Sequence, residues 1–247
     1  MADASQLSGK VAVVTGGSRG IGFAIAEGLV LLGTDVVICG RSVEVLSVAR
    51  NRLTAPAADR PVTQGHVECV QADVGKVEDC LRVIHTAVES FGGLDILVNN
   101  AGVGHFGELS EQSVNDYREV VETNLNGTFY CCKAAIPALR RRGGGWIINI
   151  SSLAGTHPFA SGAAYCASKA GVNALTEALM QELRYDGIRV SCVAPGSVGT
   201  GFVGERKEAA PWKLAVSDVS QVVIDLLCHD PRSLPSRVEI RPSKPQK

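Results

Sequence analysis

The stretch Val11-Ala12-Val13-Val14-Thr15-Gly16-Gly17-Ser18-Arg19-Gly20-Ile21-Gly22 lies near the amino terminus. Its first four residues are uniformly apolar, as is typical of a strand buried on both faces of a parallel sheet. Glycines at 16, 20 and 22 follow, with the spacing G-x-x-x-G-x-G. Because they lack side chains, backbone N–H groups can approach a pyrophosphate there, and the amino terminus of the next helix favours the anion. The stretch predicts a strand, a phosphate-binding loop and a helix in succession.

The rest of the chain repeats this alternation. Helical patterns at 43–53 and 77–91, a long one ending near 142, and one carrying Tyr165 and Lys169 alternate with strand patterns at 35–39, 66–71, 94–98, 146–150 and 188–193. The stretch from Ala55 to Pro61 reads as a surface loop rather than a linker. We therefore expect an α/β fold, a doubly wound parallel sheet (Rossmann), and a single dinucleotide-binding and catalytic domain over residues 1–247.

Composition excludes several classes of function. Twenty-four basic and 25 acidic residues leave a formal charge of -1, so nothing steers the chain toward nucleic acid or a membrane surface. No apolar run reaches membrane-spanning length, and the first residues do not resemble a signal peptide. We expect a cytoplasmic protein with a small-molecule substrate.

The eight cysteines and five histidines show no metal-ligand spacing. Most cysteines stand in apolar runs, so we expect reduced core thiols. Cys166, beside Tyr165, has no histidine near it in sequence and is expected to pack within its helix. The sequence predicts no metal site.

Tyr165-Cys166-Ala167-Ser168-Lys169 is the chemically most informative turn of the chain. Residues four apart share one face of a helix, so the Lys169 ammonium can stabilise a Tyr165 phenolate. The pattern is weak alone. Ser152, at the end of the strand pattern 146–150, and Asn124 upstream give it weight.

The candidate motifs share a position in the predicted sheet. The glycine loop follows the first strand, Asn99 to Gly102 the fourth, Ser152 the fifth and Pro195-Gly196 the sixth. In doubly wound sheets ligands bind beyond the carboxyl ends of the strands. We therefore expect these motifs to meet in one crevice.

The second strand pattern bears on the choice of cofactor. Asp35 stands where that strand begins, whereas a ribose contact would come from its carboxyl end, which is occupied by Cys39-Gly40-Arg41. An arginine there, with Arg19 in the glycine loop, suits a 2′-phosphate. The sequence predicts NADP(H).

Together these motifs resemble the short-chain dehydrogenase/reductase family over nearly the whole chain, and the branch of 3-oxoacyl carrier-protein reductases in particular. The resemblance implies that Tyr165 protonates a carbonyl oxygen, that Ser152 polarises the same oxygen, and that Lys169 binds the nicotinamide ribose and lowers the pKa of Tyr165. Asn124 would hold a water in a proton relay. The cofactor-binding residues implied are Gly16, Ser18, Arg19, Gly20, Ile21, Gly22, Arg41, Asp73, Val74, Asn100, Ala101, Gly102, Tyr165, Lys169, Pro195, Gly196, Val198 and Thr200.

The expected activity is a metal-free, NADPH-dependent interconversion of a carbonyl compound and a secondary alcohol, similar to 3-oxoacyl reduction. Two alternatives stay open: an NAD-dependent hydroxysteroid or sugar-alcohol dehydrogenase of the same family, and a catalytically silent NADP-binding regulatory protein. Sugar-nucleotide epimerases would need a larger carboxyl-terminal domain.

Two further expectations concern the substrate side and assembly. Loop residues that could face substrate are His105, Phe106, Leu153, His157, Phe159, Phe202 and Trp212. The helix bearing Tyr165 is apolar on more than one face, so we expect a homodimer or homotetramer built on the two long helices that flank the fifth strand.

Overall fold

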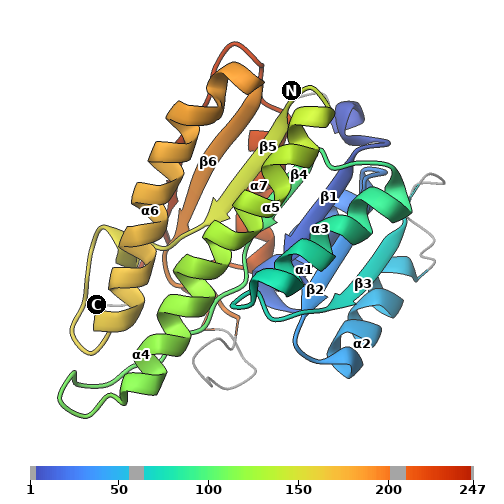
Figure 1. Cartoon of the computed structure of the whole chain (residues 1–247). Coiled ribbons are helices and arrows are strands. Elements are labelled where there is room, and N and C mark those ends of the chain that lie inside the picture. The colour runs from blue at the N-terminus through green and yellow to red at the C-terminus, as the bar shows by residue number, and fades with distance from the viewer. Residues whose placement is uncertain (1–3, 56–63, 201–209, 246–247) are drawn as a thin grey trace.

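The computed structural model describes residues 4–55, 64–200 and 210–245, and its centre is one parallel sheet (Figure 1). Within these residues the sheet has seven strands in the order β3-β2-β1-β4-β5-β6-β7. The strands are β1 (Val11–Thr15), β2 (Asp35–Gly40), β3 (Val67–Gln71), β4 (Ile96–Asn99), β5 (Gly145–Ile150), β6 (Ile188–Pro195) and β7 (Arg237–Ile240).

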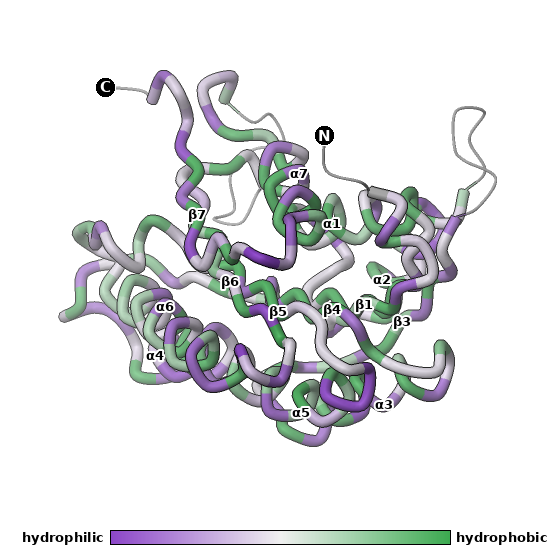
Figure 2. Tube along the Cα trace, turned by 90° about the horizontal axis from the view of Figure 1, so that it is seen from above, coloured by the Kyte–Doolittle hydropathy of each residue, from purple (hydrophilic) through white to green (hydrophobic). Residues whose placement is uncertain are grey.

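Helices cover both faces of the sheet, as Figure 2 shows from above. The helices α1 (Gly20–Leu31), α2 (Val43–Thr54) and α7 (Val216–Leu227) pack on one face. The helices α3 (Val77–Phe91), α5 (Gly127–Arg141) and α6 (Ala163–Leu183) pack on the other, and α4 (Val114–Val121) lies beside α6. This confirms the predicted doubly wound α/β sheet.

The first strand has the buried position that its sequence predicted. All five residues of β1 are buried. Ala12 and Val14 contact the core under α1, α2 and α7, whereas Val11 and Val13 contact the core under α3 and α5. A strand that is buried on both faces is apolar at successive positions and does not alternate between apolar and polar residues.

The long helix predicted to end near residue 142 is divided in two. A π-helical turn, Glu122–Asn126, separates α4 from α5. Such turns insert one extra residue per turn and occur often at functional sites. The division turns the buried side chain of Asn124 toward α6, where it bonds Ser168.

Two predictions fall wholly or partly outside what the structure describes. The surface loop from Ala55 to Pro61 is described only at Ala55, and Phe202 lies outside the described residues. Among the described helices, none combines the length and the apolar character needed to cross a bilayer. The cytoplasmic location stays a prediction.

Candidate active site

A cavity of about 670 Å³ lies at the carboxyl ends of the strands. Its walls come from the segments that follow all seven strands, including the glycine loop after β1 and residues 241–242 after β7. Segments far apart in the sequence therefore meet in one site, as the sequence predicted.

The glycine loop forms one end of the cavity floor. Gly16 and Gly20 have φ of 62° and 57°, which is the left-handed region that side chains disfavour. A Cβ on Gly20 would lie 3.6 Å from Thr200 across the cavity wall. No side-chain hydrogen bond caps the start of α1. The open helix end and the bare loop fit a bound phosphate.

Gly22 has a different place from the one predicted. It does not line the cavity. A Cβ there would lie 2.5 Å from the carbonyl oxygen of Gly16. Gly22 is thus required by the packing of α1 against the loop rather than by direct approach of a ligand.

A hydrogen-bond cluster joins the glycine loop to the segment after β4. The side-chain amide of Asn100 donates to the carbonyl oxygens of Thr15 at 3.0 Å and Gly16 at 3.2 Å. The Thr15 hydroxyl accepts from the backbone N–H groups of Asn100 and Ala101, each at 3.0 Å. These bonds fix the relative position of two cavity walls.

Arg19, in the glycine loop, and Arg41, directly after β2, both line the cavity, as do Asp73 and Val74 after β3. The Arg41 guanidinium pairs with Glu119 of α4 at 3.0 Å. Glu119 also contacts the ring of His105 at 2.9 Å. The pKa of Glu119 is lowered by the bond to His105 and then by that to Arg41. Sequence reasoning missed Glu119, because no motif joins residues 78 positions apart.

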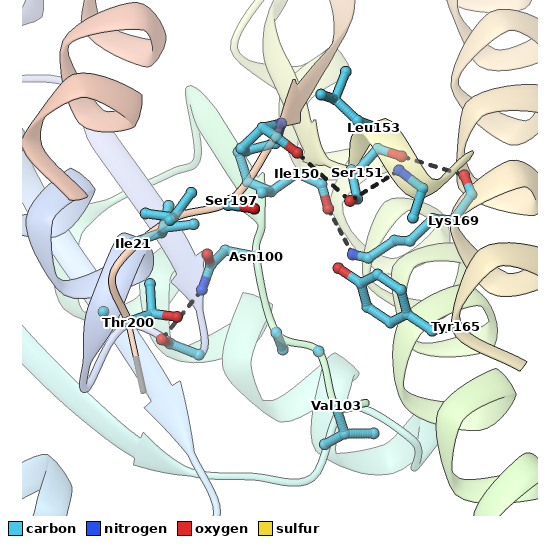
Figure 3. A pocket seen from close by; sticks show the side chains of 18 of the residues that line it. Ile21, Asn100, Val103, Ile150, Ser151, Leu153, Tyr165, Lys169, Ser197 and Thr200 are labelled. Carbon is cyan, nitrogen blue, oxygen red and sulfur yellow. Dashed lines mark hydrogen bonds between the residues drawn. The ribbon is translucent and has the colours of Figure 1, made fainter. Parts of the chain in front are cut away.

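Tyr165 and Lys169 lie on adjacent turns of α6 and point into the cavity beside Ser151 and Ile150 (Figure 3). The Lys169 ammonium donates to the Ile150 carbonyl oxygen at 2.9 Å and lies 5.8 Å from the centre of the Tyr165 ring. Ser152 accepts from the backbone N–H of Ala154 at 3.1 Å. The three predicted polar groups are brought together.

Burial controls the titration of this cluster. It raises the pKa of the Tyr165 phenol, and a hydrogen bond with Ser152 opposes that rise in part. Burial also lowers the pKa of Lys169 to about 8. The predicted lowering of the Tyr165 pKa by Lys169 is therefore not found here, since desolvation dominates both groups.

Asn124 lies behind the cavity wall rather than in it. Its side-chain N–H groups donate to the Val103 carbonyl at 2.9 Å and to the Ser168 hydroxyl at 3.0 Å, and its oxygen accepts from the Val103 N–H at 2.8 Å. A Cβ on Gly102 would lie 3.3 Å from this oxygen and 3.8 Å from the Lys169 nitrogen. Asn124 and Lys169 thus flank one open point beside Gly102.

Aromatic side chains form one wall near Tyr165. The ring centres of Phe106 and Phe159 lie 6.0 Å apart, and that of Phe106 lies 5.6 Å from Tyr165. Among the residues expected to face substrate, Phe106, Leu153, His157, Phe159 and Trp212 line the cavity. The prediction for His105 is wrong, because its ring turns to Glu119 outside the lining.

All predicted site residues except Gly22 and Asn124 line the cavity. They are Gly16, Ser18, Arg19, Gly20, Ile21, Arg41, Asp73, Val74, Asn100, Ala101, Gly102, Ser152, Tyr165, Lys169, Pro195, Gly196, Val198 and Thr200.

The sequence reasoning missed several lining residues, among them Lys213, Arg241 and Pro242. The last two directly follow β7. The carboxyl-end rule, applied to the final apolar run, would have found them.

The described residues hold no group of three or more His, Cys, Asp or Glu side chains arranged to bind a metal ion. All eight cysteines are free thiols, and Cys166 is buried in α6. Independence from metal stays a prediction.

Comparison with known proteins points to one family. The family model described as short chain dehydrogenase matches residues 10–211. An uncharacterised oxidoreductase of Staphylococcus saprophyticus is 34% identical over 237 residues, which are 96% of this chain and 99% of that protein.

Solved structures agree. A metagenomic short-chain oxidoreductase in complex with NADP is 37% identical, with a TM-score of 0.82 over 96% of this chain and 99% of that one. An alcohol dehydrogenase from the archaeon Thermococcus sibiricus, complexed with 5-hydroxy-NADP, is 29% identical, with a TM-score of 0.87 over 96% and 99%.

Proposed function

The chain belongs to the short-chain dehydrogenase family of oxidoreductases, and we propose that it is an NADPH-dependent carbonyl reductase, reversible as an alcohol dehydrogenase. The observation that carries the proposal is the meeting of Ser152, Tyr165 and Lys169 in the cavity that the glycine loop also lines. We further propose that residues 1–247 act as one dinucleotide-binding and catalytic domain.

The cavity suits the phosphate groups of a dinucleotide such as NADPH. The uncapped start of α1 faces a loop with two left-handed glycines, and Arg19 and Arg41 lie at the end where a 2′-phosphate would be held. Two similar structures were solved with NADP or a hydroxylated NADP. NADPH would supply a hydride to the substrate carbonyl carbon when bound.

Tyr165 is the proposed proton donor. Because burial raises its pKa, the phenol is protonated near neutral pH and can give its proton to a carbonyl oxygen as negative charge develops there. Ser152 would donate a hydrogen bond to the same oxygen. Lys169, with a pKa of about 8, is still largely cationic at pH 7 and would stabilise the phenolate left behind.

Asn124 is proposed as a positioning residue. Its amide holds Val103 and Ser168, and its oxygen keeps a second lone pair for a water at the point beside Gly102. That water would connect Lys169 to a supply of protons. A substrate like that of the 3-oxoacyl reductases stays a prediction, and so does the homodimer or homotetramer.

The test is Tyr165→Phe, assayed on a panel of ketones and aldehydes by the loss of NADPH absorbance. General acid catalysis contributes about 10²–10⁴ in rate, so we expect turnover to fall by that factor while NADPH binding changes less than about threefold. Tyr185→Phe is the matched control, since Tyr185 is 92% exposed and lies outside the cavity lining.

Two outcomes would contradict the proposal. A Tyr165→Phe variant that retains most of the wild-type rate would remove Tyr165 from its role. A wild type that binds NADPH yet reduces nothing in the panel would favour the catalytically silent alternative.

A further inference from the structure

Among the described residues that line the cavity, basic side chains outnumber acidic ones. Asp73, which follows β3, has the only carboxylate among the described lining residues. Among the basic lining residues, Arg19 lies in the glycine loop, Arg41 follows β2 and Lys169 lies in α6. The remaining basic side chains among the described lining residues are His157, Lys213 and Arg241, and the proposed reaction uses none of them.

The sheet order places Arg241 at the opposite end from the 2′-phosphate site. Arg41 and Asp73 follow β2 and β3 at one edge of the sheet, whereas Arg241 follows β7 at the other edge. Ser152 follows β5, between them. A ligand that reaches past Ser152 from the cofactor therefore meets the β7 end.

Contacts bring the β7 end close to Ser152. The backbone N–H of Gly196 donates to the Ile240 carbonyl at 2.8 Å. A Cβ on Gly196 would lie 3.1 Å from a Leu153 methyl and 3.2 Å from Pro242. Lys213 reaches the same wall, because the next residue, Leu214, donates its N–H to the Ser197 carbonyl at 3.0 Å.

Arg241 already binds a carboxylate. Its guanidinium donates to Glu239 at 2.7 Å, and Arg237 lies 3.6 Å from the same carboxylate. The pKa of Glu239 is lowered chiefly by Arg241, with smaller contributions from Arg237 and His157. One glutamate thus faces two arginines and a histidine, so positive charge remains at this end.

We propose that Arg241 recognises an anionic group on the substrate, and that the substrate is a carbonyl compound carrying a carboxylate on an apolar body. This inference rests on the proposed carbonyl reductase activity and deepens it. The planar guanidinium presents several donors and matches a carboxylate. Phe106 and Phe159 supply the apolar wall beside Tyr165.

The test uses phenyl keto acids in which zero to three methylenes separate the ketone from the carboxylate, each paired with its methyl ester. Initial rates with NADPH give KM and kcat for both members of each pair. Quenching of Trp212, which lines the cavity, reports binding without turnover. The other tryptophan, Trp146, is buried in β5.

We expect at least one acid to bind about tenfold or more tightly than its ester. Arg241→Gln should weaken the binding of that acid about tenfold, because a hydrogen bond to a charged group is lost. The same variant should change the KM of the ester by less than threefold. Arg237→Gln is the matched control, since Arg237 shares Glu239 but does not line the cavity. Glu239→Gln should make the acid bind more tightly, because it removes a carboxylate that competes with the substrate for Arg241.

The two proposals fail differently. Acids that bind no better than their esters at every length, or an Arg241→Gln variant that weakens both alike, would overturn the anion site and leave the reductase intact. Acids that bind in an Arg241-dependent way without being reduced would keep the anion site and overturn the reductase.

Discussion

At the β2 end of the cavity Arg41 pairs with Glu119 and, at the β7 end, Arg241 pairs with Glu239. His105 bonds the first glutamate, and His157 adds a small electrostatic contribution at the second. The spacing differs. Glu119 is 78 residues from Arg41, whereas Glu239, in β7, is only two residues from Arg241, which directly follows that strand.

This difference separates a tertiary contact from a local one. The pair at Glu119 ties α4 to the segment after β2, and through His105 to the segment after β4. The pair at Glu239 ties only neighbouring residues of the β7 end. Arg41 is therefore held by a distant helix, whereas the ion pair of Arg241 is with Glu239 of the adjacent strand.

Between the two ends lies a cation of another kind. Lys169 is only 5% exposed, whereas the side chains of Arg41 and Arg241 are 59% and 50% exposed. Solvent screens the two arginine pairs, so each contributes little to stability. Burial of Lys169 instead disfavours its charge.

The largest effect is expected at this centre, in the difference between the unfolding free energies of the wild type and Lys169→Met. The lysine loses its proton near pH 8 in the folded chain and near 10.5 in the unfolded chain. Between these values the unfolded state binds more protons, so wild-type stability rises with pH. Relative to the variant the rise should be about 3 kcal/mol.

Urea unfolding from pH 7 to 10.5 measures this difference. Groups common to both proteins cancel, and Lys133→Met controls for removing an exposed lysine of α5. A difference between wild type and Lys169→Met that stays constant with pH would mean that burial does not hold the lysine neutral in this range.

The next effect concerns the arginines themselves. Arg41→Gln should lower the affinity for NADPH by about one to two orders of magnitude and leave the affinity for NADH unchanged, because only NADPH carries the 2′-phosphate. Arg241→Gln should leave both cofactors unchanged. Fluorescence titrations with each cofactor decide the matter. Equal loss of NADH affinity in Arg41→Gln, or loss of NADPH affinity in Arg241→Gln, would contradict the assignment of the β2 end to the cofactor and the β7 end to the substrate.

The sequence predicted most of this arrangement for physical reasons. Apolar strands, the glycine loop and the Tyr165–Lys169 spacing are local patterns, and the carboxyl-end rule joined them in one cavity. The pair formed by Arg41 and Glu119 was invisible, because it depends on how α4 packs after the π-helical turn. Burial of Tyr165 was equally hidden, and it raises the pKa of the phenol where the sequence predicted that the pKa is lowered.

The close packing at Gly22 and the orientation of His105 were hidden for a related reason. Their residue types fitted a ligand site, but the chain uses Gly22 for the close packing of α1 on Gly16 and His105 for a bond to Glu119. Residue type and spacing place a side chain near a cavity. Only tertiary packing decides whether it turns toward the cavity or toward a neighbour.

The smallest predicted effect is also the most direct test of the comparison. Glu119→Gln removes a negative charge that competes with a 2′-phosphate for Arg41. The amide oxygen can still accept from Arg41, and the amide NH2 can donate to Nε2 of a neutral His105 ring. Exposed ion pairs contribute about 0.2–1 kcal/mol, so NADPH should bind about two- to fivefold more tightly, with NADH unchanged. Because salt screens exposed charges, the gain should be largest at low ionic strength and should shrink toward 1 M salt. Glu239→Gln, the same change at the other end, should leave both cofactors unaltered. Looser NADPH binding by Glu119→Gln would show instead that the carboxylate is needed to hold Arg41 in position, and that the tertiary pair favours the phosphate rather than competing with it.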